Sequence, residues 1–449
     1  MATSSRKKGL KIVFVGGGSY NWGPTILSDL GRESVLEGAE VVLLDVNLKA
    51  AREIAAAAAR MAKTLKRTFT FTATTSQARA FKGADFVLIT ISTGGLDAMA
   101  HDLEVPEKFG VLHTVGDSCG PGGWSRALRN IPVFVQLAQA IEKHAPTAVV
   151  LNYTNPMGAL TGVLHECSSL RSVGLCHGVF ATYRLLQNLF NVEESDLALH
   201  FGGVNHFFWV TDFTVNGKPG YPLLKKCLQD QSLDTALAHG DSDEMGFHSH
   251  HALCDELYRR TGYLGYAGDR HTCEFVPDLL SEEGMSTNRF KLERTSIGQR
   301  RDKFSLARQR ALDLAAGKSK PPKRSRETAV DIIKAFVTNK PFTDVVNLPN
   351  TGQIDNLPRR AVVETPGRID ALGFAPITIG SLPPILERMV RPHCEVQLLT
   401  LEAGLLGDRE LAIEALLADP LCAHVKPSDV RQMGQELLDA NSELLPQFQ

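Results

Sequence analysis

Two residues near the middle of the chain carry side chains that bind divalent transition metals. Cys176 lies in VGLCHGV, and His206 lies in GGVNHFFW. A soft thiolate together with an imidazole suits such a metal. The two residues are thirty positions apart, which is not a local ligand spacing. The sequence alone therefore leaves a buried apolar cysteine and a hydrogen-bonded turn histidine as alternatives.

A second segment, Thr261–Phe275, is rich in groups that can exchange protons. It reads TGYLGYAGDRHTCEF and is poor in aliphatic residues. Loops of this composition on a rigid scaffold often carry function, although a structural loop held by hydrogen bonds would use the same residues. The candidates for a general acid or base are Tyr263, Tyr266, Asp269 and His271.

Cations that could bind an anion occur in two places. Arg126 and Arg129 lie in GPGGWSRALRN, where a helix should begin behind a glycine-rich turn. Arg270 lies beside His271 in the second segment. A planar guanidinium can grip a carboxylate at two points. The alternatives are a solvated helix face for the first pair and a structural salt bridge to Glu274 for Arg270.

The N-terminal region predicts an NAD site. In KIVFVGGGSY an apolar strand runs into three glycines, which let backbone N–H groups and a helix N-terminus approach a pyrophosphate. The next strand, VVLLD, ends in an acidic residue that suits the ribose hydroxyls of NAD and disfavours the 2′-phosphate of NADP. Asn21 replaces the third glycine of G-x-G-x-x-G, so a glycine turn without a ligand stays an alternative. The predicted contacts here are Gly16, Gly17, Gly18, Ser19, Tyr20 and Asp45.

These residues must be positioned by a sheet. The first half of the chain alternates apolar strands with helical patterns, which predicts βαβ units and a mostly parallel sheet covered on both faces. Ligands bind beyond the carboxyl ends of such strands, so Thr93, Asn152 and Asn155 should face the nicotinamide together with Cys176. The expected strands are Lys11–Val15, Val41–Asp45, Phe86–Ile91, Ala148–Asn152 and Val173–Cys176, and the expected helices are Thr25–Leu36, Leu48–Leu65, Ala127–His144 and Gly158–Cys167.

Near Leu197 the pattern changes to two antiparallel strands, Leu197–Gly203 and Phe207–Val215, followed by a helix-rich remainder. The predicted fold class is α/β, a Rossmann-like doubly wound parallel sheet with a second α+β lobe. We assign residues 1–200 to an NAD-binding domain and residues 201–449 to a lobe for substrate, metal and oligomerisation.

Composition narrows the class of protein. The 449 residues are 43% hydrophobic and carry a formal net charge of -2, which argues against a nucleic-acid partner. No apolar run is long enough to span a bilayer, and MATSSRKKG reads as a polar tail and not as a signal peptide. Eight cysteines without a C-x-x-C pair indicate reduced thiols, so we expect a cytoplasmic protein without a membrane partner.

The combined order of VGGGSY, GPGGWSRALRNIPV, NYTNPMG, CHGV and GGVNHFFW resembles glycoside hydrolase family 4 over nearly the whole chain. The resemblance implies a glycosidase that uses NAD and a divalent metal, usually manganese. It implies Cys176 and His206 as metal ligands and Asn155 as a substrate contact. For the catalytic base it implies Asp269 first, with Tyr263 or Tyr266 in reserve. It also implies a homodimer or homotetramer.

The chemistry implied by this resemblance is a redox cycle, an exception to hydrolysis by two carboxylates. NAD oxidises the sugar at C3, a base removes the C2 proton, and the aglycone leaves by elimination. Water then adds, and the hydride returns to C3. The metal would act as a Lewis acid on the C2 and C3 oxygens.

The tetrapeptide CHGV, which begins at the metal cysteine, is most similar to that of the family's α-glucuronidases. His177 therefore belongs to the predicted catalytic and substrate-binding set. An acidic sugar needs a cationic partner, for which Arg129, Arg270 and His271 are candidates. The resemblance thus predicts a small α-glycoside as substrate: a glucuronide or galacturonide, or a sulfoquinovoside.

Three alternatives remain from the sequence. One is a neutral α-galactosidase or α-glucosidase of the same family. Another is an NAD-dependent dehydrogenase of the lactate/malate type, which the first half also resembles, although such an enzyme needs no thiolate and is shorter. The third is a non-catalytic NAD-binding sensor.

Overall fold

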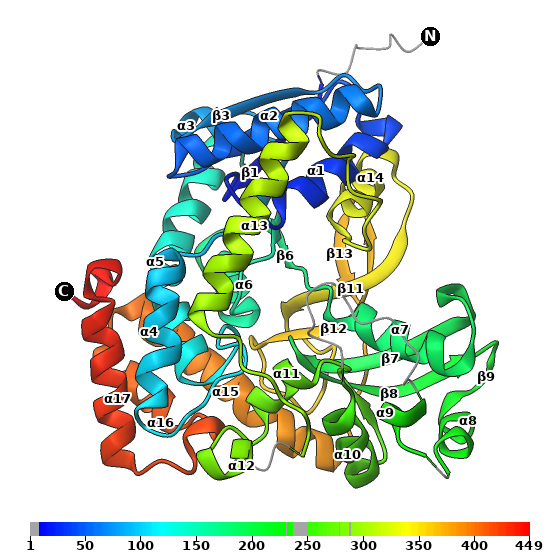
Figure 1. Cartoon of the computed structure of the whole chain (residues 1–449), viewed down its shortest axis with the longest axis vertical. Coiled ribbons are helices and arrows are strands. Elements are labelled where there is room, and N and C mark those ends of the chain that lie inside the picture. The colour runs from blue at the N-terminus through cyan, green and yellow to red at the C-terminus, as the bar shows by residue number, and fades with distance from the viewer. Residues whose placement is uncertain (1–8, 230, 237–249, 278, 287–288) are drawn as a thin grey trace.

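The structure is a computed structural model, and it describes residues 9–229, 231–236, 250–277, 279–286 and 289–449. Figure 1 shows one central sheet flanked by helices, with the C-terminal helices beside elements from the first half of the chain. Within the described ranges, no helix has the length and apolar character needed to cross a membrane.

Six strands form the parallel part of the sheet, in the spatial order β6-β5-β4-β1-β2-β3. The order reverses at β1 and β4, which creates the crevice where doubly wound folds bind ligands. A site is therefore expected at the carboxyl ends of the central strands. The six are β1 (Lys11–Val15), β2 (Glu40–Leu44), β3 (Thr70–Thr74), β4 (Phe86–Ile89), β5 (Val149–Asn152) and β6 (Arg171–Gly174).

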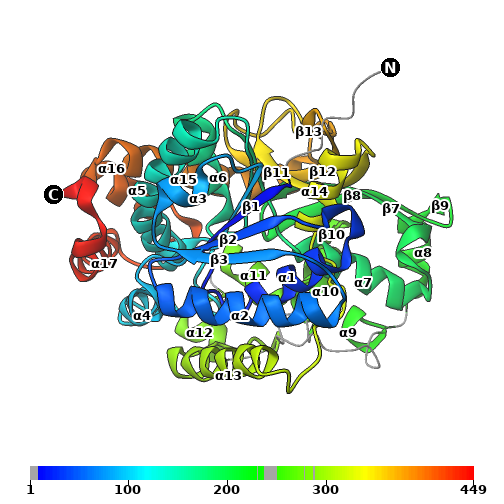
Figure 2. The same cartoon turned by 90° about the horizontal axis from the view of Figure 1, so that it is seen from above.

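Alternate residues of β1 enter two different cores. Val13 and Val15 share one core with α5 (Gly120–His144) and α6 (Met157–Cys167). Ile12 and Phe14 share the other with α1 (Gly23–Arg32) and α2 (Leu48–Thr64). Successive side chains of a strand point to opposite faces, so the sheet is covered on both sides. Figure 2 shows α1 and α2 on one side of the strands and α5 and α6 on the other.

Strands from the second half extend the same sheet. β7 (Leu197–Val204) and β8 (Phe207–Val215) form a hairpin, and β11 (Phe342–Pro349) pairs antiparallel with β12 (Val362–Asp370). β11 joins β6, and β12 joins β7, so the hairpin is attached to the parallel strands through this pair. The β7–β8 turn is thereby carried to the carboxyl end of β6.

The other elements are shorter strands and the surrounding helices. The strands are β9 (Lys218–Pro219), β10 (Leu264–Gly265) and β13 (Gly373–Pro376). The helices are α3 (Gln77–Phe81), α4 (Gly95–Glu107), α7 (Gly178–Phe190), α8 (Gly220–Cys227), α9 (Leu233–Ala236), α10 (Ala252–Thr261), α11 (Asp269–Thr272), α12 (Glu282–Ser286), α13 (Ile297–Ala315), α14 (Ala329–Thr338), α15 (Pro384–Leu406), α16 (Arg409–Leu417) and α17 (Pro427–Ala440).

The predicted α/β fold is confirmed, with two shifts that bear on the site. β6 ends at Gly174, so Cys176 lies in the loop after the strand. α5 begins at Gly120 and not at Ala127, because Pro121 suits a first helical turn, where its fixed φ is helical and its missing N–H is not needed. The predicted strands do not include β3 or any of β9 to β13.

The two halves of the chain are interlocked. α15 packs against α5 and α6, and α17 packs against α4. Buried residues of α16 and α17 belong to the same core as Val13 and Val15 of β1. The sheet and this core both contain residues from before and after position 200. The assignment of two domains with a boundary between residues 200 and 201 therefore stays a prediction.

Candidate active site

Cys176 and His206 meet at the carboxyl edge of the parallel sheet. The Cys176 Sγ lies 3.1 Å from His206 Nε2, and both residues are buried. His206 occupies the tight β7–β8 turn, with a φ of +65°. Burial raises the pKa of the Cys176 thiol and lowers the pKa of His206 to about 4, so the imidazole is neutral. This pair can hold a metal, which would displace the thiol proton on binding.

Ser118 and Asp117 orient the imidazole. The Ser118 Oγ lies 2.7 Å from His206 Nδ1 and donates its proton to Asp117 Oδ1 at 2.9 Å. Because that proton is committed to Asp117, Ser118 can only accept from Nδ1–H. The remaining lone pair then sits on Nε2 and faces Cys176. An outer partner of this kind fixes the tautomer of a metal-binding histidine.

Asp117, His206 and His271 form a second group of possible metal donors, since their ligand atoms lie within 4.8 Å of one another. The rings of His206 and His271 stack, with centroids 4.0 Å apart and an interplanar angle of 29°. His206 belongs both to this group and to the pair with Cys176, so the two possible donor sets meet at one imidazole.

A buried carboxylate shapes the turn that carries Asp117 and Ser118. The Glu274 side chain is fully buried and accepts the backbone N–H groups of Val115 and Gly116 at 2.7 and 2.8 Å. Asp117, Ser118 and Glu274 are absent from the predicted site. The residues GDSC directly before the GPGG start of α5 were the available signal for the first two, but nothing local links Glu274 to them.

The glycine loop has the shape of a cofactor cradle. A Cβ on Gly16 would lie 2.0 Å from the Thr90 carbonyl oxygen, and the φ of Gly16 is +86°, so only glycine fits. Gly18 donates its N–H to Asp45 Oδ2 at 2.8 Å. Gly17 and Ser19 complete the turn through backbone hydrogen bonds to Leu44 and Gly16.

Three residues that were predicted to contact the cofactor, Tyr20, Thr93 and Asn152, form hydrogen bonds with other residues of the protein. The Tyr20 hydroxyl donates to Glu53 at 2.6 Å. Thr93 Oγ1 donates to the Asn130 amide oxygen at 2.7 Å. Asn152 is fully buried, and its amide bonds Thr154 and Thr161, which builds the turn after β5. The structure thus gives these side chains partners within the protein, and their role as cofactor contacts stays a prediction.

We predict that the protein binds NAD at least about 10-fold more tightly than NADP. A 2′-phosphate near the Asp45 carboxylate would cost about 1–4 kcal/mol at roughly 4 Å, and 1.4 kcal/mol is tenfold in affinity. Calorimetric titration with each dinucleotide measures the ratio. Asp45→Asn keeps an acceptor for the Gly18 N–H and removes the charge. It should therefore reduce the difference in affinity between NAD and NADP. Equal or tighter binding of NADP by the wild type would refute this role of Asp45.

Asn155 lies in the turn between β5 and α6. Its peptide bond to Pro156 is cis. The Asn155 carbonyl oxygen accepts the Nε–H of Arg126 at 3.0 Å. Its Oδ1 atom is buried and has no hydrogen-bond partner within the described part of the chain. A buried acceptor without a partner suits a ligand hydroxyl.

Asp269 is buried at the start of α11. Its carboxylate accepts the first-turn N–H groups of Leu253 and Cys254, at 2.8 and 3.0 Å, and so caps α10. Burial raises the pKa of Asp269 to about 8. The carboxyl group therefore changes charge close to neutral pH, a property of general bases as well as of buried caps.

The two tyrosines of the same loop lie in different surroundings. The Tyr266 ring stacks on His206 with centroids 5.8 Å apart, and it also packs against Gly178. Tyr263 packs edge-on against Tyr221, at 5.9 Å between centroids. Of the two, Tyr266 is the one beside the metal-binding pair.

Two predicted anion-binding arginines are held by the protein itself. Arg129 is fully buried and pairs through both terminal nitrogens with Asp102. Arg270 donates to the Glu293 carbonyl oxygen at 2.9 Å and to the Thr295 hydroxyl. Because the Asp102 carboxylate occupies both terminal nitrogens, Arg129 has a structural role, and substrate binding by Arg129 stays a prediction without support from these contacts. The alternative pairing of Arg270 with Glu274 is replaced by these contacts.

His177 follows Cys176 directly and keeps part of its side chain exposed, 35%. Its Nδ1 lies 3.6 Å from Glu327 Oε1, and its ring lies 5.4 Å from that of Trp22. Burial raises the pKa of Glu327 to about 7. Partial exposure beside a metal-binding residue keeps His177 a candidate substrate contact.

A sequence model described as family 4 glycosyl hydrolase matches residues 11–192, and the model of that family's C-terminal domain matches residues 201–422. The chain belongs to glycosyl hydrolase family 4. An α-galacturonidase of Thermoanaerobacter italicus is 33% identical over 98% of each chain. A Bacillus subtilis structure titled putative glucosidase lplD is 30% identical, covers 96% of this chain and 99% of its own, and has a TM-score of 0.87.

A 6-phospho-α-glucosidase from gut microorganisms, solved in complex with NAD and Mn²⁺, shares the fold at 20% identity. It covers 98% of this chain and 99% of its own, with a TM-score of 0.83. Membership of the family makes the protein a glycoside hydrolase. Family membership therefore excludes two of the alternatives left by the sequence, a lactate/malate-type dehydrogenase and a non-catalytic NAD-binding sensor.

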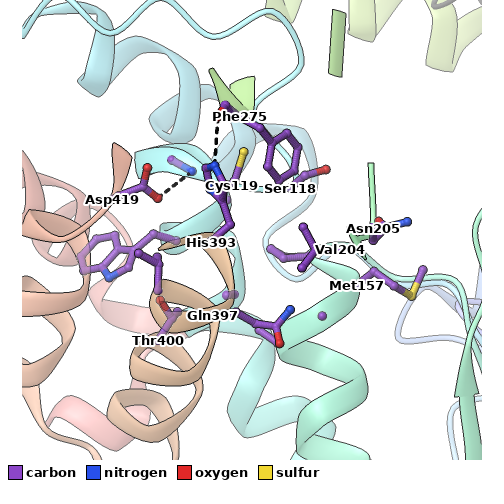
Figure 3. Close-up of a pocket in the computed structure, with 18 residues that line it drawn as sticks. Ser118, Cys119, Met157, Val204, Asn205, Phe275, His393, Gln397, Thr400 and Asp419 are labelled. Carbon is purple, nitrogen blue, oxygen red and sulfur yellow. Dashed lines mark hydrogen bonds between the residues drawn. The ribbon is translucent and has the colours of Figure 1, made fainter. Parts of the chain in front are cut away.

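A pocket lies beside the β7–β8 turn, where Val204 and Asn205 line it. Two of its lining residues, Ser118 and Asn205, also contact the metal-binding pair. Figure 3 shows Gln397 and Thr400 of α15 on one side and Val204 and Asn205 on the other. Asn205 donates to Glu364 at 2.9 Å, while its buried Oδ1 has no partner within the described ranges. Asn205, which lines the pocket, therefore carries an unused acceptor.

Replacing Arg129 with methionine should destabilise the enzyme by about 3–5 kcal/mol, because Asp102 would be left as an unpaired buried charge. Urea denaturation followed by circular dichroism measures the change. Arg301→Met removes an arginine whose ion pair with Asp97 is exposed, and its effect should stay within the error of the measurement. Equal stabilities of the two variants would contradict the structural role of Arg129.

Proposed function

We propose that this family 4 enzyme hydrolyses α-glycosides of an acidic sugar, with an α-galacturonide as the first candidate. The observation that carries the proposal is the Cys176–His206 pair, 3.1 Å apart at the edge of the sheet that also presents the glycine loop. The relative named α-galacturonidase supports the choice of sugar. An α-glucuronide and a sulfoquinovoside are the acidic alternatives, and a neutral α-galactoside or α-glucoside is the alternative without charge.

NAD and a divalent metal such as Mn²⁺ are the proposed cofactors. The cradle at Gly16, which a Cβ would fill, and the thiol–imidazole donor set fit the two groups. The related 6-phospho-α-glucosidase, solved with both, supports the same pair here. When bound, these groups supply reversible oxidation at C3 of the sugar and Lewis-acid polarisation of its neighbouring oxygens.

The residues of the chain bind the sugar and move its protons. Asn155 Oδ1 accepts a sugar hydroxyl. Ser118 holds His206 in the tautomer that leaves Nε2 available. Asp269 takes the C2 proton, because a carboxyl with a pKa of about 8 is both basic and able to ionise near neutral pH. Tyr266, packed on His206, is the second candidate for that step.

The test is a panel of 4-nitrophenyl α-glycosides incubated with enzyme, NAD and Mn²⁺. The panel contains the galacturonide, glucuronide, sulfoquinovoside, galactoside and glucoside. We expect release of nitrophenol without net accumulation of NADH, and the highest kcat/KM for an acidic sugar. Faster turnover of a neutral sugar than of every acidic one would reject the proposal.

The assembly and location of the enzyme stay predictions. We propose a homodimer or homotetramer in the cytoplasm that acts on a small glycoside. Light scattering of the purified protein measures the oligomeric state, and a monomer at micromolar concentration would contradict the first part.

A further inference from the structure

Arg126 and Arg129 stand three residues apart on α5, and only Arg129 has a carboxylate partner. Arg126 donates Nε–H to the Asn155 carbonyl oxygen at 3.0 Å. Across the described residues, no carboxylate oxygen lies within 4.0 Å of its guanidinium. The side chain is half-buried, so water replaces such a partner only in part. A guanidinium in this setting is suited to an anionic ligand.

The charges around Arg126 are not balanced. Arg300 of α13 donates to the Val115 carbonyl oxygen at 2.7 Å and likewise has no carboxylate within 4.0 Å in the described ranges. Burial lowers the pKa of both guanidinium groups, and the charge of Asp117 offsets part of that effect for each. Of the other carboxylates that act on these two groups, Asp102 is paired with Arg129, and Glu274 accepts the backbone N–H groups of Val115 and Gly116. Asp117 is therefore the carboxylate that Arg126 and Arg300 share in a partly dehydrated space, where a further anion would be stabilised.

The position of Arg126 points to the sugar and not to the cofactor's pyrophosphate. Asn155 follows β5, whereas the glycine loop follows β1, and β4 lies between those strands. Neighbouring strands are about 4.8 Å apart, so β5 is roughly 10 Å from β1. Asn155 also contributes the buried Oδ1 acceptor described above. A ligand here would meet a cation and a hydroxyl acceptor together.

We propose that Arg126, together with Arg300, binds the anionic group of the sugar and thereby determines specificity. The inference rests on the proposed function, an α-glycosidase for acidic sugars. A planar guanidinium binds a carboxylate or a sulfonate through two parallel hydrogen bonds. A neutral hydroxymethyl group would use one of these donors and leave the charge uncompensated, so it would be disfavoured.

The test compares Arg126→Gln, Arg126→Lys and Arg300→Gln with the wild type. Arg301→Gln is the matched control, because it removes a charge from α13 at an exposed ion pair. Substrates are the 4-nitrophenyl α-galacturonide and α-sulfoquinovoside, and the α-galactoside, which lacks the charge. The dissociation constant of NAD is measured by calorimetry, and the melting temperature reports folding.

We expect Arg126→Gln to raise KM for the preferred acidic substrate by about 100-fold, with a smaller change in kcat. Hydrolysis of the galactoside should change by less than about 10-fold, because it would lose at most one hydrogen bond to a neutral group. The affinity for NAD should change by less than about 3-fold, the scatter we expect for a group outside the cofactor contacts. Arg126→Lys should retain part of the acidic preference, since it keeps the charge but loses the planar fork. Arg300→Gln should shift KM in the same direction by less.

Three outcomes would overturn the inference. An unchanged ratio of acidic to neutral kcat/KM in Arg126→Gln would assign anion binding elsewhere. A loss of NAD affinity with equal losses for both sugars would assign Arg126 to the cofactor's phosphates. A wild type that prefers the galactoside would reject the proposed function and this inference together, whereas the first two outcomes reject only the inference.

Discussion

Cys176→Ser should lower kcat by at least about 1,000-fold, while the variant still binds NAD. Lewis-acid stabilisation by a bound metal is worth several kcal/mol, and about 4 kcal/mol corresponds to that factor. Serine cannot supply the soft anionic donor that sits 3.1 Å from His206 Nε2. Electron paramagnetic resonance of added Mn²⁺ measures metal binding separately from activity, and calorimetry measures NAD binding.

The control for this experiment is Cys167→Ser. Cys167 ends α6 and is partly exposed, so its replacement should change neither metal binding nor kcat. Ser118→Ala should weaken Mn²⁺ binding by about 10- to 100-fold, since the imidazole would lose the partner that fixes its tautomer. Full activity of Cys176→Ser after exhaustive chelation would rule out the proposed metal site.

Asp269→Asn should lower kcat by about 100- to 10,000-fold and stop exchange of the C2 hydrogen with solvent. The amide cannot take a proton, but its oxygen can still accept one of the two N–H groups that the carboxylate accepts, so α10 keeps part of its cap and the variant should fold. In the wild type, kcat should rise as pH increases through about 8, because the carboxyl must lose its proton to act as a base. That rise should be absent from the variant.

Tyr266→Phe and Tyr263→Phe test the competing candidates. Tyr263 packs against Tyr221, so its loss should leave exchange at C2 unchanged. If exchange persists in Asp269→Asn and disappears in Tyr266→Phe, the base is Tyr266. A melting temperature of Asp269→Asn close to that of the wild type separates a loss of chemistry from a loss of the cap.

The sequence by itself determined the local elements and the identity of the family. β1 is the strand predicted at Lys11–Val15, and α2 begins at the predicted Leu48. Both depend on the spacing of apolar residues within one segment, which is a local property. The glycines before α1 were also readable, because a strand followed by glycines and a helix is a contiguous pattern.

The tertiary structure decided which polar residues reach the site and which serve the scaffold. Arg126 and Arg129 have the same chemistry on the same helix, yet α4 supplies Asp102 to Arg129, and Arg126 lies against Asn155. Cys176 and His206 meet because β11 and β12 attach the β7–β8 hairpin to β6. Such pairings depend on which surfaces far apart in sequence pack together, and local periodicity carries no information about that choice.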